Sequence, residues 1–250
     1  MAATSYINIF FFLLSAILTI TTAQAKSVLY HVNKIAYEGY ALSAGKQAPA
    51  VIIFHDWDGL TAYEIKRAEM LKKMGYSVFA ADLFGKGVRP TKDTDRRQHT
   101  GELYKDRVKM RALVQAAVDE AKKQGMNTKN AIAMGYCFGG AAVLELARSG
   151  SNLKGFATFH GGLSTPNNQD YSKTKGKLLI MHGSADKAIK MSDFAKLADE
   201  LEQYKIPHEM ISYGGAQHAF TVFGGERYHK DADQKSWRSF LDFLKKQTKS

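Results

Sequence analysis

Short runs of apolar residues recur along the chain and predict buried strands. The clearest run covers residues 50–54, which are mostly β-branched or aromatic and end directly before the polar pair His55 and Asp56. This length and composition are typical of a strand in the interior of a sheet. Comparable runs predict further strands at residues 77–81, 131–134, 155–159, 177–181 and 208–212.

Between these strands, apolar residues recur at the spacing of an amphipathic helix. The longest such face consists of Met110, Leu113, Val114, Ala117, Val118 and Ala121. A shorter one, from Ile65 to Leu71, is followed by Gly75, which predicts the end of that helix. The same spacing predicts helices around residues 141–147, 194–201 and 237–244.

Strands that alternate with helices of this length predict an α/β fold, with a mostly parallel sheet covered by helices on both faces. No internal repeat or Pro-rich linker interrupts the pattern, so residues 26–250 are expected to form one domain. In such sheets, ligands bind outside the carboxyl ends of the strands. Polar residues that directly follow a strand are therefore candidates for a functional site.

Residues 1–25 differ from the rest of the chain because they contain no charged side chain. Their apolar core ends in Ala23-Gln24-Ala25, which predicts a signal peptide cleaved after Ala25 and hence a periplasmic or secreted protein. After cleavage, no stable association with a membrane is expected. The alternative is an uncleaved membrane anchor, because Lys and Arg are missing before the apolar core.

Charge and cysteine content narrow the classes of function. The formal net charge of +11 is compatible with binding to acidic polymers, but the lysines are dispersed and no aromatic-basic motif accompanies them. A basic surface without a nucleic-acid partner is therefore the favoured interpretation. A single cysteine, Cys137, cannot form an internal disulfide. It is either a reactive thiol or a small buried apolar side chain.

The surroundings of Cys137 favour a reactive thiol. Gly135-Tyr136-Cys137-Phe138-Gly139-Gly140 lies between a predicted strand and a predicted helix. This is the pattern of a nucleophile elbow with cysteine in the position of serine. Glycines are required because the sharp turn leaves no room for neighbouring Cβ atoms. The start of the following helix is expected to favour the thiolate over the thiol.

Two partners for this nucleophile follow in the chain order expected for the α/β-hydrolase fold. Asp186 comes directly after one predicted strand, and His218 lies in a glycine-rich loop after the last one. A histidine can take the proton of the nucleophile, and a carboxylate can orient that histidine. The sequence therefore predicts Cys137, Asp186 and His218 as catalytic residues. Taken singly, an aspartate such as Asp186 more often forms a turn and a histidine such as His218 more often lies at the surface, so their order and their placement at strand ends carry the prediction.

The chain resembles the dienelactone hydrolase family over essentially all of residues 27–247. The resemblance is carried by residues 55–60, 81–87, 135–140, 182–186 and 217–220. It implies a Cys137-His218-Asp186 triad, an oxyanion hole formed by the backbone N–H groups of Phe138 and Trp57, and no metal or cofactor. The implied reaction is the hydrolysis of a small-molecule ester or lactone through an acyl-enzyme.

Two positions depart from the family pattern. Asp56 stands where family members usually have a glutamate that engages the cysteine, so Asp56 is a candidate for tuning the nucleophile. The alternative is that Asp56 caps the helix that opens near Leu60. Val222 stands where dienelactone-cleaving members have an arginine for the substrate carboxylate. Lys86 and Arg89, in a loop after a predicted strand, are the remaining candidates for substrate binding.

Three further histidines end predicted strands, namely His55, His160 and His182. Together with Asp56 they could ligate a metal. They lack any spacing typical of metal sites, which favours hydrogen-bonded structural histidines instead. A second function also stays open at this point. The chain could be a non-catalytic exported binding protein that uses the same pocket.

Overall fold

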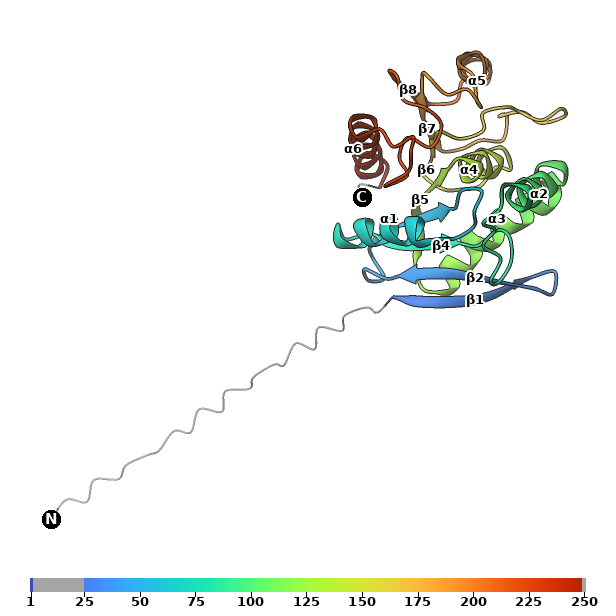
Figure 1. Ribbon diagram of the computed structural model, residues 1–250. Coiled ribbons are helices and arrows are strands. Elements are labelled where there is room, and N and C mark those ends of the chain that lie inside the picture. Colours follow the sequence, from blue (N-terminus) through green and yellow to red (C-terminus); the bar gives the residue numbers. More distant parts are fainter. Residues whose placement is uncertain (2–24, 249–250) are drawn as a thin grey trace.

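Within the part of the chain that the computed structural model describes, residue 1 and residues 25–248, an eight-stranded sheet forms the middle layer (Figure 1). Its order is β1-β2-β4-β3-β5-β6-β7-β8. The β1–β2 and β2–β4 pairs are antiparallel, and all other neighbours are parallel. The strands are β1 (Lys26–Val32), β2 (Ile35–Leu42), β3 (Pro49–Phe54), β4 (Ser77–Ala81), β5 (Asn127–Tyr136), β6 (Gly155–Phe159), β7 (Lys177–Gly183) and β8 (His208–Tyr213).

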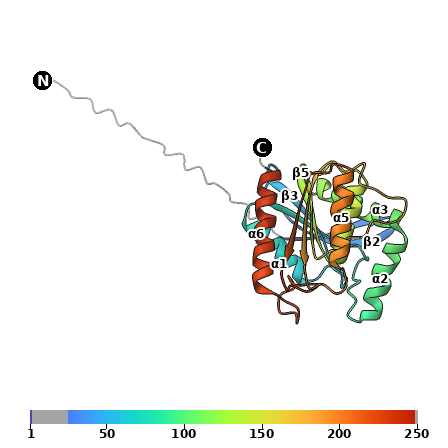
Figure 2. The same ribbon diagram turned by 90° about the horizontal axis from the view of Figure 1, so that it is seen from above.

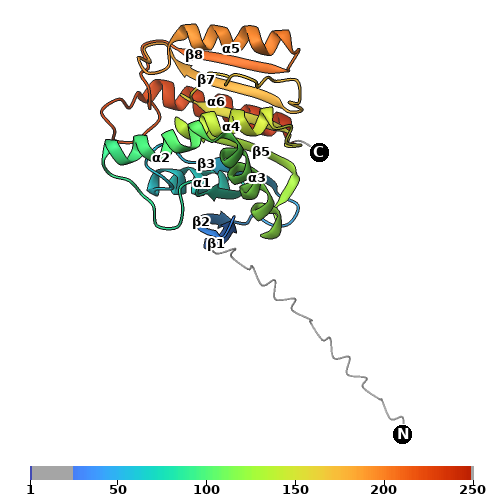
Figure 3. The ribbon, with the colours of Figure 1, turned by 90° about the vertical axis from the view of Figure 1, so that its right-hand side faces the viewer.

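Helices cover both faces of this sheet. On one face lie α1 (Ala62–Lys73) and α6 (Lys230–Gln247) (Figure 2). Their apolar residues pack with the sheet into one core. The other face, turned toward the viewer in Figure 3, carries α2 (Asp93–Lys105), α3 (Arg107–Lys123), α4 (Phe138–Arg148) and α5 (Met191–Gln203). This arrangement confirms the predicted fold class.

Every strand and helix predicted from the sequence is present, although several extend further than predicted. The hairpin of β1 and β2 and the helix α2 were not predicted. In β1, exposed and buried residues alternate, and Leu29 keeps 52% of its surface exposed. Such an edge strand lacks the continuous apolar run of the central strands. In α2, only Thr100 and Leu103 are buried, so its sequence contains almost no apolar periodicity.

The predicted signal peptide, residues 1–25, falls almost entirely on residues 2–24, which lie outside the described residues. Its cleavage therefore stays a prediction. Among the described residues, no helix has the length and apolar character needed to cross a membrane.

The parallel strands bring their carboxyl ends to one edge of the sheet. Directly after these ends come His55 and Asp56 from β3, Cys137 from β5, His160 from β6, Asp186 from the loop after β7, and His218 from the loop after β8. The candidate residues of the site therefore come from segments far apart in the sequence.

Candidate active site

Cys137 occupies a sharp turn between β5 and α4. Its backbone lies in the left-handed region, with φ of 49°, which is uncommon for a residue other than glycine. A Cβ atom on Gly135 would lie 2.2 Å from the carbonyl oxygen of Gly139, and one on Gly139 would lie 2.2 Å from that of Phe54. The predicted strand-to-helix turn is thus present, and its glycines are required by these contacts. Cys137 as a whole residue keeps part of its surface exposed.

The His218 ring lies between the thiol and a carboxylate. His218 Nε2 is 3.0 Å from Cys137 Sγ, and His218 Nδ1 is 2.7 Å from Asp186 Oδ2. An ionised Asp186 accepts hydrogen bonds only, so the Nδ1–H of the ring donates to it. Nε2 is then free to accept the proton of the thiol. The structure therefore brings together the three residues predicted as a triad.

Close backbone contacts hold the loops of Asp186 and His218 together. The N–H of Ala185 donates to the carbonyl of Ala216 at 3.0 Å, and the N–H of Gly215 donates to Ser184 Oγ at 2.9 Å. A Cβ on Gly183 would lie 2.3 Å from the carbonyl oxygen of Ala216, so glycine permits this approach. These contacts fix the histidine relative to its carboxylate.

Asp186 is held as a carboxylate although it is buried. Burial by itself raises the pKa of Asp186, but hydrogen bonds to His218 and to the backbone N–H groups of Ile189 and Ala188 bring it below its ordinary value. The two N–H groups donate to Oδ1 at 2.9 and 2.8 Å, which leaves Oδ2 for the histidine. The negative charge can therefore orient and stabilise a protonated His218.

The thiol itself is held in its neutral form. Burial raises the pKa of Cys137 most, and the charges of Asp56 and Asp186 raise it further. The N–H of Phe138 and the charge of Arg227 act in the opposite direction but are outweighed. The start of α4 therefore acts on the thiol in the expected direction, through the N–H of Phe138, but it is not the dominant effect. Desolvation and two carboxyl groups exceed the effect of the helix terminus.

Asp56 lies in a cluster of carboxyl groups. Burial raises the pKa of Asp56 well above its ordinary value, and the charges of Asp58 and Glu64 add to this. Glu64, which is fully buried, has its pKa raised to about 7, mainly by burial. The alternative that Asp56 caps the helix is wrong, because Thr61 caps α1 and forms a capping box with Glu64.

The two predicted oxyanion donors lie next to this cluster. The N–H of Phe138 points toward the thiol closely enough to lower its pKa. Within the described part of the chain, no acceptor is bonded to the N–H of Trp57. The Trp57 ring is flanked by the guanidinium groups of Arg96 and Arg97, at 5.2 and 5.8 Å from its centroid.

A hollow of about 240 Å³ lies next to the loops after β3 and β8, and none of the elbow residues 135–140 lines it. It is lined by Asp56, Trp57, Asp58, Arg96, Ala219, Val222, Gly225, Glu226 and Arg227. Arg96 and Arg227 were not predicted as site residues, because neither belongs to a motif. Arg96 pairs with Asp93 at 3.0 Å, whereas Arg227 is exposed and forms no ion pair with any described residue. The hollow therefore contains cations at positions other than the one occupied by Val222.

The two cations predicted for substrate binding are placed elsewhere. Arg89 donates to the carbonyl oxygens of Leu60 and Val88 and lies 3.6 Å from Asp82. Its guanidinium group thus links segments on either side of β4. Lys86 is exposed on the same loop. Neither residue lines the hollow next to the loops after β3 and β8.

The three further histidines form hydrogen bonds with the protein. His55 donates from Nδ1 to the carbonyl of Asp56 at 2.6 Å and accepts at Nε2 from the N–H of Leu83 at 3.0 Å. His160 Nε2 lies 2.8 Å from Thr221 Oγ1, and its ring packs edge-on against His218 with centroids 5.4 Å apart. Burial lowers the pKa of His160, so it is neutral. His182 bonds to the carbonyl of Ile189.

A larger hollow, of about 560 Å³, lies at the amino-terminal edge of β5 and β6 and includes none of the candidate residues. Among the described residues, no group of three or more His, Cys, Asp or Glu side chains is arranged to hold a metal ion. The elbow and the loops after β3 and β8 are therefore the place where the candidate residues converge.

A parallel sheet with a nucleophile elbow, followed in the chain by an acid and a histidine from strand ends, defines the α/β-hydrolase class. The sequence profile of the dienelactone hydrolase family matches residues 37–248, and the chain belongs to that family. This membership confirms the resemblance stated from the sequence and the predicted class of enzyme, a hydrolase of ester or lactone bonds.

Individual relatives agree with this assignment. The solved structure of m3DLH superposes with a TM-score of 0.84 at 28% identity, over 89% of this chain and 98% of that one. P91, from metagenomic libraries, is described as a dienelactone hydrolase-like promiscuous phosphotriesterase; it has a TM-score of 0.82 and 26% identity over the same shares. A Saccharolobus solfataricus protein with the provisional name carboxymethylenebutenolidase is 29% identical over 68% of this chain, which spans 62% of that protein.

Proposed function

We propose that the protein hydrolyses small-molecule esters or lactones through a covalent acyl-enzyme on Cys137. The observation that carries this proposal is the chain of hydrogen bonds from Cys137 Sγ through the His218 ring to Asp186. The family membership supports the type of bond cleaved. The hydrogen-bond distances support the roles proposed for Cys137, His218 and Asp186.

Acylation begins with a neutral thiol, because the pKa of Cys137 is raised by burial. His218 Nε2 accepts the proton from Sγ as Sγ attacks the carbonyl carbon, so base and nucleophile act together. The carbonyl oxygen gains a negative charge, and we assign its stabilisation to the N–H groups of Phe138 and Trp57. When the tetrahedral intermediate collapses, the bond to the alkoxide breaks and His218 returns the proton to the leaving oxygen.

Deacylation repeats these steps with water. His218 takes a proton from the water molecule, whose oxygen attacks the thioester, and the bond from Sγ to the acyl carbon breaks. His218 returns its proton to Sγ as this bond breaks, so the products are the carboxylic acid and the regenerated thiol. Asp186 stabilises the protonated His218 in both halves of the reaction. Asp56 is proposed to tune the nucleophile, since its charge raises the pKa of Cys137.

The experiment is acylation by an activated ester such as p-nitrophenyl acetate. We expect release of p-nitrophenolate and, on rapid quenching, one acyl group on the peptide that contains Cys137. Iodoacetamide should alkylate the folded protein once and abolish turnover. The substitution Cys137→Ala should abolish turnover as well. An Ala variant that keeps most of its activity, or acylation at another residue, would exclude this mechanism. A native protein that binds esters without releasing product would be the binding protein considered from the sequence.

Export is proposed separately from the reaction. Its basis is the apolar segment before Ala23-Gln24-Ala25. Amino-terminal sequencing of protein recovered from its native host should begin at Lys26. Intact Met1 on membrane-bound protein would favour an anchor instead.

A further inference from the structure

His160, directly after β6, packs against the histidine of the triad. Its ring meets the ring of His218 edge-on, with centroids 5.4 Å apart, and also packs against Phe220 of the same loop, with centroids 5.3 Å apart. His160 is fully buried, and its backbone lies in the left-handed region, with φ of 41°. For a residue other than glycine this conformation is uncommon and persists only where the surrounding structure fixes it.

One hydrogen bond orients the His160 ring. Its Nε2 lies 2.8 Å from Thr221 Oγ1, whereas its Nδ1 has no hydrogen-bond partner among the described residues. Burial lowers the pKa of His160 well below its ordinary value, so the ring is neutral and one of its nitrogens can accept a hydrogen bond. Thr221 is fully buried and follows His218 in the same loop. This bond therefore ties the loop of His218 to the end of β6.

Thr221 is held in turn from α1. Thr221 Oγ1 lies 2.7 Å from the hydroxyl oxygen of Tyr63, to which Arg67 Nε donates at 3.3 Å. Nη2 of Arg67 donates to the carbonyl of Thr221 at 3.0 Å and also to the carboxylate of Asp233 in α6. The side chains of Arg67 and Asp233 are only 1% and 6% exposed, so their ion pair is shielded from water. These side chains form the Thr221 anchor, which consists of Thr221, Tyr63, Arg67 and Asp233.

The arginine gives the hydrogen bonds of the Thr221 anchor one favoured direction. A guanidinium group can only donate, so the Tyr63 oxygen accepts from Arg67 and the Tyr63 O–H donates to Thr221. The Thr221 hydroxyl then donates to His160 Nε2. The opposite direction would leave the hydroxyl hydrogen of Tyr63 without an acceptor, which is costly away from water. The hydroxyl of Thr221 thus acts as acceptor and donor at once, a role that valine cannot fill.

We propose that His160 is a positioning residue for the reaction, whose ring, fixed by the Thr221 anchor, holds His218 in line with Cys137 and Asp186. Asp186 binds one nitrogen of the His218 ring, and packing against His160 restricts the rotation about that bond. A displacement of about 1 Å in a reacting group can cost ~10² in rate. The proposal rests on the hydrolytic function proposed above, in which His218 must reach the thiol and later the water molecule.

The first test is Thr221→Val, which keeps the branched side chain and removes the hydroxyl. We expect kcat for a neutral ester to fall by about tenfold or more while KM stays within about twofold, because the base rather than substrate binding is disturbed. Thr221→Ser should restore kcat to within about threefold, since it returns the hydroxyl. Thr158→Val is the matched control, because Thr158 is equally buried and its hydroxyl has no partner among the described residues.

Two outcomes of this test would overturn the proposal. One is a Thr221→Val enzyme with the kcat of wild type or of Thr158→Val, and the other is a loss that Thr221→Ser does not restore. His160→Asn removes the ring itself, and asparagine tolerates the positive φ at this position. Its kcat should fall at least as far as that of Thr221→Val, and an unchanged kcat would equally overturn the proposal.

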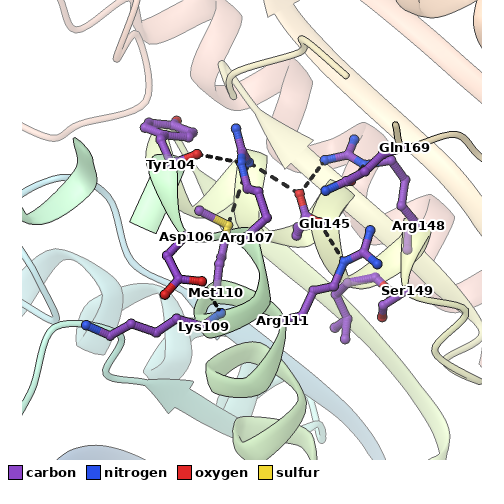
Figure 4. Close-up of polar contacts among 12 residues, drawn as sticks. Tyr104, Asp106, Arg107, Lys109, Met110, Arg111, Glu145, Arg148, Ser149 and Gln169 are labelled. Carbon is purple, nitrogen blue, oxygen red and sulfur yellow. Dashed lines mark hydrogen bonds and ion pairs between the residues drawn. The ribbon is translucent and has the colours of Figure 1, made fainter. Parts of the chain in front are cut away.

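The second test compares Arg67→Lys with Arg148→Lys and decides the proposal even where Thr221→Val fails to fold. Figure 4 shows Arg148 beside Glu145 of α4, with which it pairs at 2.8 Å. Both arginines have side chains that are 1% exposed, and the guanidinium carbon of each lies 5.3 Å from the centroid of a tyrosine ring. Only Arg67 is bonded to Thr221.

We expect both lysine variants to lower the melting temperature, because lysine lacks the planar fork of donors that each arginine uses. Only Arg67→Lys should also lower kcat, by more than about threefold. Equal kcat values in the two variants would overturn the role of the Thr221 anchor. Cys137→Ala separates this proposal from the function on which it rests. An active Cys137→Ala enzyme would overturn the nucleophile, whereas an inactive one beside a fully active Thr221→Val enzyme would overturn only the role of His160.

Discussion

Two buried carboxyl groups flank the thiol, and their surroundings are opposite. Asp186 accepts hydrogen bonds from His218 and two backbone N–H groups, which bring its pKa below the ordinary value in spite of burial. Asp56 has Asp58 and Glu64 as neighbours, and burial together with their charges raises its pKa. The charge of either group raises the pKa of Cys137. One residue type therefore has two protonation behaviours within one site.

The difference teaches that donors, rather than burial, decide which carboxyl stays ionised. Both side chains are almost fully buried, so desolvation raises the pKa of each. Only Asp186 has enough hydrogen-bond donors to overcome that effect. An ionised Asp186 can support a protonated His218, whereas a negative charge on Asp56 is opposed by burial and by the charges of Asp58 and Glu64. Environments that separate two carboxyl groups in this way assign them separate roles.

The largest expected effect is the loss of kcat when the negative charge of Asp186 is removed. Asp186→Asn should lower kcat by at least ~10², because the uncharged amide neither stabilises the protonated histidine nor selects its tautomer. His218→Ala should lower kcat by at least ~10² as well. Asp56→Asn should change kcat by less than about tenfold, since Asp56 has no bond to the histidine. Steady-state kinetics on one neutral ester measures all three.

Circular dichroism of each variant provides the control for folding. If Asp56→Asn lost as much activity as Asp186→Asn, the two carboxyl groups would not differ in role and the comparison would fail. A fully active His218→Ala enzyme would remove the triad from the mechanism.

A smaller effect is expected on the reactivity of the thiol. The thiolate is the form that reacts with iodoacetamide, and its fraction is low because the pKa of Cys137 is raised. Alkylation should therefore accelerate steadily from pH 6 to pH 9 without reaching a plateau. Asp56→Asn removes one opposing charge and should increase the rate at pH 7 by about tenfold, equal to one pKa unit. A rate equal to that of wild type would show that Asp56 does not tune the thiol.

The two groups should also give stability opposite dependences on pH. Asp186 has a folded pKa below its unfolded value, so its contribution is present above about pH 4 and is lost as pH falls through the folded pKa. Asp56 has a folded pKa above its unfolded value, so stability falls as pH rises from about 4 through the folded pKa. Glu64, with its pKa raised to about 7, acts in the same direction as Asp56.

Melting temperatures of the Asn variants separate these contributions. At pH 8, Asp56→Asn should raise Tm by about 2–4 °C and Asp186→Asn should lower it by a similar amount, each corresponding to ~1 kcal/mol. At pH 4 the effect of Asp56→Asn should disappear, because wild-type Asp56 is then protonated. The same sign for both variants at pH 8 would contradict the assigned protonation states.

The central sheet could be predicted because its strands are buried on both faces. Strands such as β4 and β6 consist only of buried residues, so a run of apolar letters identifies them and their limits. The hairpin of β1 and β2 has one exposed face, and the signal missed there was its turn. Asn33 and Lys34 both have positive φ, which is the conformation of a two-residue hairpin loop. Helix α2 offered no comparable signal.

In the site, too, residues that belong to a sequence motif could be predicted, whereas residues outside any motif could not. Cys137, Asp186 and His218 could be placed because glycines and strand ends restrict where such residues occur. The capping residue of α1 was also visible, since Thr61 and Glu64 have the spacing of a capping box. Arg96 and Arg227 reach the site from α2 and from the loop before α6. Only the packing of distant segments brings them there, and no local pattern records it.

The smallest expected effect concerns the charge of the substrate. Val222 lines the hollow where dienelactone-cleaving relatives were expected to have an arginine, so it provides no donor for a carboxylate. The hollow has mixed charge, because Asp58 and Glu226 oppose Arg96 and Arg227. Arg96 is also paired with Asp93. Neutral short-chain esters or lactones should therefore be cleaved at least as efficiently as matched anionic ones.

The measurement is kcat/KM for a neutral and an anionic substrate of matched structure at moderate salt. Salt screens the attraction between the net charge of +11 and the anionic substrate, so the rate of encounter differs less between the two substrates. Only interactions that strengthen in the transition state raise discrimination in the chemical step. A preference for the anion above about tenfold, equal to ~1.4 kcal/mol, would contradict the expectation. Arg227→Met would then lower kcat/KM for the anion alone if that exposed arginine replaces the missing one. Lys86→Met is the matched control, since Lys86 lies outside the hollow.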